Sequence, residues 1–362
     1  MRPVLLLAAF TAIALALRSR FRPAPTAAGS IVMAVGIFGL AELQQMSGIQ
    51  ALVTRPLALG LLVLWLFIAA SYVESWLGGR GDEHSGPLVG RYAIGSWIAG
   101  TTVMLHLLLR GLPEWLPLAA ALGVLACGLW LWYLVVAGKA FPGVARQSSR
   151  ELVSGVVLLS TVSTQSIAIA ALDLLPRPMA WRGLAVSLIA AGFVLYVVNA
   201  VVVVRSFFRA RNWTLADDWD NSNCILHGAM SITGLAVVLW GASPPAVVLT
   251  TWLYVLAVFV AVESVELARL AVRVRSYGWR RGAFSYHVTQ WSRNFTWGMF
   301  YAFTLVYAHA DPGPQIDWVR ALQQPILSFG PYVGLLLLLV ETGLCLEDNL
   351  GRRPVLRRAG GV

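Results

Sequence analysis

The chain has 362 residues, of which 58% are hydrophobic and 12% are charged, and its net charge is +10. Soluble proteins carry about 25% charged residues, so this composition leaves no room for a large soluble domain. The positive charge is distributed as in a membrane protein, and no nucleic-acid partner is predicted. The three cysteines lie far apart in the sequence and predict neither a disulfide nor a metal site.

The first apolar run covers residues 3–17 and precedes a basic linker. A helix of this length is about 22 Å long, which is too short to cross a bilayer core of about 30 Å. We therefore expect a short extra N-terminal helix. A cleaved signal peptide is the alternative, although Arg18 and Arg20 stand where a small-residue cleavage site would be.

Ten longer apolar runs follow and predict an all-α integral membrane protein. The sequence divides into the N-terminal helix with its linker (1–25), a transmembrane domain (26–346) and a basic cytoplasmic tail (347–362). The ten helices are expected near residues 28–46, 54–77, 92–110, 115–138, 151–175, 180–205, 223–242, 246–272, 284–308 and 329–346.

Lysine and arginine residues are concentrated in alternate linkers. By the positive-inside rule, this predicts a multi-pass protein of the plasma membrane, with both ends of the transmembrane domain in the cytoplasm. The opposite side carries few basic residues, which are Arg55, Arg110, Arg177, Arg182 and Arg320.

The odd-numbered predicted helices are rich in small and polar residues, and the even-numbered ones are more hydrophobic. This alternation predicts five repeated hairpins with the odd helices inside, around a central pore. Helix packing alone is the alternative explanation for each stretch of small residues. The residues expected to line the pore are Gly36, Thr101, Ser163, Thr164, Gln165, Ser231 and Thr233.

Several ionisable residues fall within or near the predicted spans. Arg293 either pairs with an acidic residue of an even-numbered helix or attracts anions as an unpaired charge in the pore. His287, Glu263 and Glu341 are candidates for coupling transport to protons or charge, with interfacial anchoring as the alternative. His227 is expected to be a solvated interfacial histidine.

Four segments of the odd-numbered helices carry motifs of a known family. They are residues 31–39 (IVMAVGIFG), 162–169 (VSTQSIAI), 224–236 (CILHGAMSITGLA) and 291–304 (WSRNFTWGMFYAFT). In this order, they resemble the tellurite-resistance/C4-dicarboxylate transporter family, which includes the slow-type guard-cell anion channels of plants. The resemblance covers residues from about 25 to 346.

The resemblance implies a conduit for small anions, such as halide, nitrate, dicarboxylate or oxyanions, assembled as a trimer. It implies that a phenylalanine of the ninth span, here Phe295, occludes the pore. The sequence differs from the family's pattern at two positions. Thr296 replaces a proline that kinks the helix in the family, and Arg293 replaces an apolar residue.

Two other classes of function stay open at this stage. One is a non-conducting scaffold or subunit that kept the helix bundle. The other is an intramembrane enzyme acting on a lipid-linked substrate, for which His227 with Asp220 is a weak candidate pair. No catalytic residues, cofactor or metal site are predicted.

Overall fold

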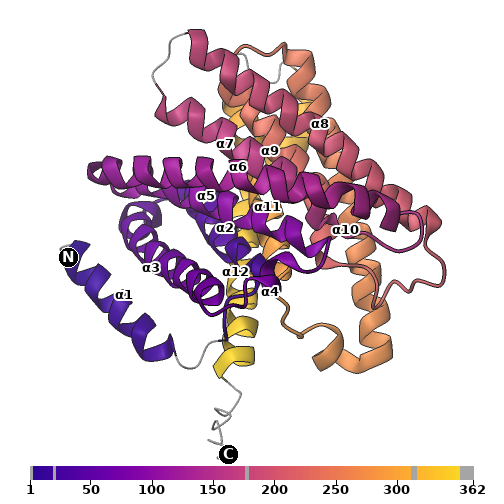
Figure 1. The fold of residues 1–362 in the computed structure, drawn as a ribbon. Helices are drawn as coiled ribbons and strands as arrows, with labels where there is room; N and C mark the ends of the chain where they lie inside the picture. The colour runs from indigo at the N-terminus through magenta and orange to yellow at the C-terminus, as the bar shows by residue number, and fades with distance from the viewer. Residues whose placement is uncertain (1–2, 19–21, 176–178, 311–315, 351–362) are drawn as a thin grey trace, which may run out of the picture.

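The computed structural model describes residues 3–18, 22–175, 179–310 and 316–350, and all regular secondary structure in them is helical. The α-helices pack into one bundle, with α1 at its edge beside α3 (Figure 1). They are α1 (Pro3–Leu17), α2 (Gly29–Ile37), α3 (Ile49–Leu77), α4 (Asp82–Ser85), α5 (Gly95–Gly111), α6 (Leu116–Gln147), α7 (Leu159–Leu174), α8 (Met179–Arg209), α9 (Ile225–Trp240), α10 (Pro245–Gly282), α11 (Gln290–His309) and α12 (Asp317–Leu350).

Within the described residues, nine helical segments are long and apolar enough to cross a membrane. By helix length and hydropathy, the chain is therefore a multi-pass membrane protein. The nine segments coincide with nine of the predicted spans. The other predicted span corresponds to α11, whose first half contains Gln290, Arg293 and Asn294. Since α11 packs against α2, α9 and α12, protein surrounds much of this more polar helix.

Burial alternates along the chain as the sequence predicted. Between 72% and 89% of the most apolar 18-residue stretch is buried in four segments, which are Thr26–Gln45, Gly90–Gly111, Gly155–Leu174 and Asn221–Trp240. In the other five segments only 22% to 39% is buried. The small and hydroxyl residues of the odd-numbered spans therefore belong to inner helices, and the more hydrophobic even-numbered spans form an outer layer.

The inner helices form a closed ring. Helix α2 packs against α5, α5 against α7, α7 against α9, α9 against α11, and α11 returns to α2. Three glycines near the starts of these helices allow the backbones to approach closely. A Cβ atom on Gly29, Gly95 or Gly155 would lie 2.4, 2.8 or 2.3 Å from the carbonyl oxygen of Ser96, Leu159 or Ser222, each near the start of the next inner helix. These neighbouring helices therefore begin at the same end of the ring.

A repeated hydrogen bond links the outer layer to the ring. The indole Nε1 of an outer-helix tryptophan donates to the Oγ1 of a threonine on the next inner helix, and the distance is 3.0 Å in each of three cases. Each threonine donates in turn to the carbonyl four residues earlier, over 2.7 to 2.8 Å. The pairs are Trp65–Thr101, Trp130–Thr164 and Trp252–Thr304. The same contact between an outer helix and the next inner helix therefore occurs three times in the bundle.

Several helices extend beyond their predicted ends. The prediction ended the fourth span at residue 138, but α6 continues through Pro142 to Gln147. A proline inside a helix costs one hydrogen bond and local strain. Packing offsets this cost here, because Ala140 and Val144 are fully buried. Helices α10 and α12 are likewise longer than expected, and a residue of positive φ, Gly278, interrupts the end of α10.

The predicted N-terminal helix is present as α1, 15 residues long. It packs against α3, where the ring of Phe10 lies 3.6 Å from the position of a Cβ atom on Gly60. An ion pair between Arg18 and Glu74 joins the end of α1 to the end of α3. Residues 347–350, predicted as the start of the basic tail, are instead the end of α12, whereas residues 351–362 and the residues around Arg177 lie outside the described residues.

Candidate functional site

The residues predicted to line a pore are all buried. Two of them, Thr101 and Thr164, accept the hydrogen bonds from outer-helix tryptophans described above and therefore face the outer layer. Ser163, Thr164, Gln165 and Ser231 are 0% exposed, and Thr101 and Thr233 are 2% exposed. Gly36 of α2 is also buried. Because solvent the size of water does not reach these side chains, no open aqueous path passes along them in this conformation.

Their hydroxyl groups donate hydrogen bonds within their own helices. Ser163 and Thr164 both donate to the carbonyl of Ser160, over 3.1 and 2.8 Å. Ser231 and Thr233 donate to the carbonyls of residues 227 and 229, over 2.9 and 2.8 Å. Such bonds satisfy the hydroxyl hydrogen and leave oxygen lone pairs as the remaining polar groups.

Gln165 lies on inner helix α7 but binds an outer helix. Its Nε2 donates to the carbonyl of Ile189 in α8 over 3.0 Å, and the amide packs over Gly192 of the same helix. The Oε1 atom of Gln165 is buried without a hydrogen-bond partner. In this conformation Gln165 therefore joins α7 to α8.

Phe295 is 1% exposed and lies where α11 is held between two other inner helices. The next residue, Thr296, occupies the space above Gly228 of α9, where a Cβ atom would lie 2.1 Å from Thr296 Cγ2. One turn from Phe295, Gly298 allows Ile37 of α2 to approach, 2.6 Å from the position of a Cβ atom. Helix α11 runs from residue 290 to 309 without a break, so Thr296 leaves it free of a proline kink.

Arg293 is paired with acidic residues of α10. Its Nη2 lies 2.5 Å from Oε2 of Glu263, and its Nη1 lies 3.7 Å from Oε2 of Glu266. Arg269 also lies 3.5 Å from Glu266, which additionally accepts a hydrogen bond from Nε1 of Trp219 over 2.9 Å. Of the two alternatives for Arg293, the structure shows the ion pair rather than an unpaired charge in the pore.

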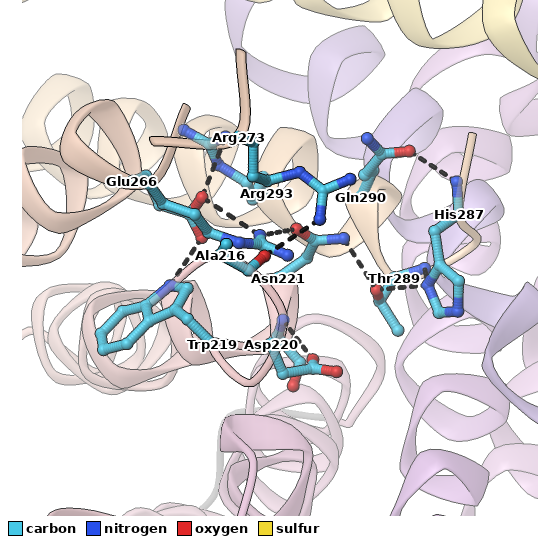
Figure 2. A network of polar contacts seen from close by, with 12 residues as sticks. Ala216, Trp219, Asp220, Asn221, Glu266, Arg273, His287, Thr289, Gln290 and Arg293 are labelled. Carbon is cyan, nitrogen blue, oxygen red and sulfur yellow. Dashed lines mark hydrogen bonds and ion pairs between the residues drawn. The ribbon is translucent and has the colours of Figure 1, made fainter. Parts of the chain in front are cut away.

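Around this ion pair, a polar network joins the starts of α9 and α11 to α10 (Figure 2). Asn221, at the start of the α9 segment, accepts from Arg269 over 2.5 Å and donates to Thr289 over 3.2 Å. Thr289 is hydrogen bonded to Nδ1 of His287, 2.7 Å away, and the His287 amide donates to Gln290. The network fixes this end of the ring, and His287 lies at its exposed rim.

His227 is buried, so the prediction of a solvated histidine is wrong. It is 1% exposed, its ring meets Phe259 edge-on at 5.2 Å, and its Nε2 is 4.0 Å from Glu263. The sequence could not reveal this, because the residues that cover His227 come from other helices. Asp220 instead caps the turn before α9 by accepting from the Ser222 amide over 2.7 Å, so it does not pair with His227.

The remaining coupling candidate, Glu341 of α12, is 6% exposed and its Oε1 has no hydrogen-bond partner. Glu266, Trp219 and Asn221 belong to this network but were not among the predicted site residues. The spacing of Glu263, Glu266 and Arg269, three residues apart on one helix face, was the available signal. In the described residues, no cluster of three or more His, Cys, Asp or Glu side chains could hold a metal ion.

In comparisons with known proteins, no protein-family model and no curated protein matches this chain.

Proposed function

We propose that this membrane protein passes small anions through the centre of its five-helix ring, and that Phe295 closes the path in the conformation described above. The closed ring of hydroxyl-rich inner helices is the observation that carries the proposal. In this proposal the hydroxyl groups, which also bond to carbonyls of their own helices, serve a path as well as helix packing.

Two physical features favour an anion over a cation. Neighbouring inner helices begin at the same end of the ring, as the contacts of Gly29, Gly95 and Gly155 indicate. Helix N-termini carry partial positive charge, so their convergence produces a positive potential at that end. Hydroxyl groups of the inner helices that bond only to their own helix, such as those of Ser163 and Ser231, can replace part of the hydration shell of a small anion.

The mechanism we propose is displacement of Phe295. The aromatic ring would have to leave the axis for an anion to pass, either by a side-chain rotation or by a small rotation of α11. Because α11 is held on one side by Ile37 and on the other by Gly228, the movement would depend on these two contacts.

The resemblance to the tellurite-resistance/C4-dicarboxylate transporter family supports the same proposal through residues 31–39, 162–169, 224–236 and 291–304. It also suggests ten membrane crossings, with α11 as the ninth, a C-terminus in the cytoplasm of a plasma-membrane protein, and a trimer. Native mass spectrometry of the purified protein in detergent tests the trimer.

A second candidate is a non-conducting scaffold that kept the fold. The observation that favours it is the pairing of Arg293 with Glu263 and Glu266, which removes the one positive side chain that the sequence placed in the pore. On this hypothesis the buried hydroxyls serve only helix packing.

Anion flux in proteoliposomes separates the two candidates. Purified protein is reconstituted, and entry of chloride, nitrate and a dicarboxylate is followed down an imposed gradient against protein-free vesicles. Transport predicts protein-dependent entry of at least one anion, saturating with the amount of protein. Folded protein that gives no entry of any of the three contradicts transport and favours the scaffold.

A further inference from the structure

Glu42, near the end of the first inner segment, is a buried carboxyl group that the proposed function does not use. Its side chain is 2% exposed, and its Oε2 atom has no hydrogen-bond partner. The ion pairs of the described residues involve other carboxylates, and none involves Glu42. An ionisable residue without a partner inside a membrane protein is costly and commonly functional.

The backbone that carries Glu42 is irregular. Residues Phe38–Glu42 form a π-helical turn at the end of α2, and a 3₁₀ turn follows at Leu43–Gln45. A π-turn inserts a residue into the helix, is rare, and is frequently found at functional sites. Here it ends on Glu42, whose side chain lies among helices α11 and α12 rather than in lipid.

Two glycines on neighbouring helices make room for the carboxyl group. A Cβ atom on Gly334 of α12 would lie 2.1 Å from Oε1 of Glu42, and one on Gly298 of α11 would lie 3.3 Å from Oε2. Gly298 is three residues after Phe295, so the two residues share a face of α11. The carboxyl group therefore sits about one helical turn from the residue that closes the ring.

The described side chains packed against the Glu42 carboxyl group supply no positive charge. Tyr301 of α11 interacts electrostatically with Glu42 and does not carry positive charge. The α12 residue against it is Gly334, and the nearby Trp297 indole is uncharged. A carboxylate in this setting would lack both water and a neighbouring cation, and burying such a charge is costly.

We propose that Glu42 binds the proton that crosses the membrane together with the transported anion, an inference that rests on the proposed function. Water on one side supplies the proton and an O–H bond forms on the carboxylate. After the ring opens toward the other side, the bond breaks and the proton returns to water there. Since Arg293 is already neutralised by Glu263, a proton on Glu42 removes the negative charge that would repel an anion passing Phe295.

Simultaneous measurement of anion entry and internal pH tests this inference. Proteoliposomes with a trapped pH-sensitive dye receive an inward nitrate gradient, with the membrane potential clamped by potassium and valinomycin. The wild-type protein is expected to acidify the lumen as nitrate enters. Glu42→Gln keeps the size and hydrogen-bonding ability of the protonated acid, so it should still fold and should lose the acidification. Glu347→Gln, an exposed carboxylate near the other end of α12, should retain it.

A second variant moves the carboxyl group without removing it. Gly334→Ala places a Cβ atom 2.1 Å from Oε1, so the carboxyl group must shift, and proton movement should fall. Gly343→Ala on the same helix meets nothing within 4 Å and should leave proton movement unchanged. Nitrate entry without acidification in the wild type, or equal acidification with Glu42→Gln, overturns the inference and leaves the anion path standing. Absence of nitrate, chloride and dicarboxylate entry overturns the proposed function, and the inference of proton coupling is then overturned as well.

Discussion

Arg293 of inner helix α11 and Glu263 of outer helix α10 form an ion pair, with 2.5 Å between Nη2 and Oε2. The pair explains how an arginine can lie in a segment that sequence patterns assign to the membrane. It also ties the helix that carries Phe295 to the outer layer. Movement of α11 would therefore act on the network around Glu266 and Asn221 at the same end of the ring.

Loss of either partner of this pair should destabilise the protein. Arg293→Gln or Glu263→Gln is expected to lower the free energy of unfolding by about 1–3 kcal/mol, less than for a fully buried pair because both side chains are partly exposed. Unfolding in detergent can be followed by circular dichroism for both single variants and the double variant. The double variant should lose less than the sum of the two, and a fully additive loss would contradict the pairing.

The repeated Trp–Thr hydrogen bond should contribute to stability at each position. Thr304→Val keeps the shape of the side chain but leaves Nε1 of Trp252 without its acceptor, so we expect a loss of about 1–2 kcal/mol. Thr250→Val is a suitable control, because Thr250 is exposed and its hydroxyl bonds only to carbonyls of its own helix. Thermal unfolding of both variants tests this prediction, and equal losses would show that the indole contact is unimportant.

The helices pack closely at the end of the ring where the inner helices begin, and this packing should not tolerate a methyl group at Gly29. A Cβ atom there would lie 2.4 Å from the carbonyl oxygen of Ser96, a backbone atom that cannot turn aside. We expect Gly29→Ala to cost about 1–3 kcal/mol by forcing α2 and α5 apart. Gly128→Ala on outer helix α6 meets open space and should raise helix stability slightly. The same melting temperature for both variants would argue against a tight ring.

His84, in the short helix α4 between two spans, should make stability depend on pH. It is 3% exposed, its Nδ1 is hydrogen bonded to Thr26 over 2.9 Å, and its ring contacts Tyr72 and Trp97 edge-on. Burial lowers the pKa of His84 below its ordinary value of 6.5, although Glu83 opposes the shift. The unfolded chain therefore binds more protons, and stability falls as the pH drops through about 6.5.

Melting temperatures measured from about pH 8 to about pH 5 test this dependence, since histidine titrates in that range. The decline on the acid side should be shallower in His84→Gln, which keeps a polar side chain without the titration. His287→Gln serves as the matched control, because His287 is exposed. An identical acid-side decline in wild type and His84→Gln would contradict the assignment.

The spans and their inner or outer position were predictable because lipid and protein select different side chains. Small residues such as Gly36 and hydroxyl residues such as Thr164 mark helices that contact protein on most sides. Helix ends were harder to predict, as α6 shows by continuing through Pro142, because tertiary packing offsets the local cost. The burial of His227 and the turning of Gln165 toward α8 depend on which helices become neighbours, and a single sequence does not contain that information.

The most direct test of the anion path is conductance of Phe295→Ala compared with Phe259→Ala in planar bilayers or proteoliposomes. Phe259 is an outer-helix aromatic residue that stacks on Phe300, so its truncation loosens packing beside α11 without removing the closing side chain. We predict increased chloride or nitrate conductance for Phe295→Ala and conductance close to wild type for Phe259→Ala. Folded Phe295→Ala protein that conducts no anion, or an equal increase in both variants, would contradict a path closed by Phe295.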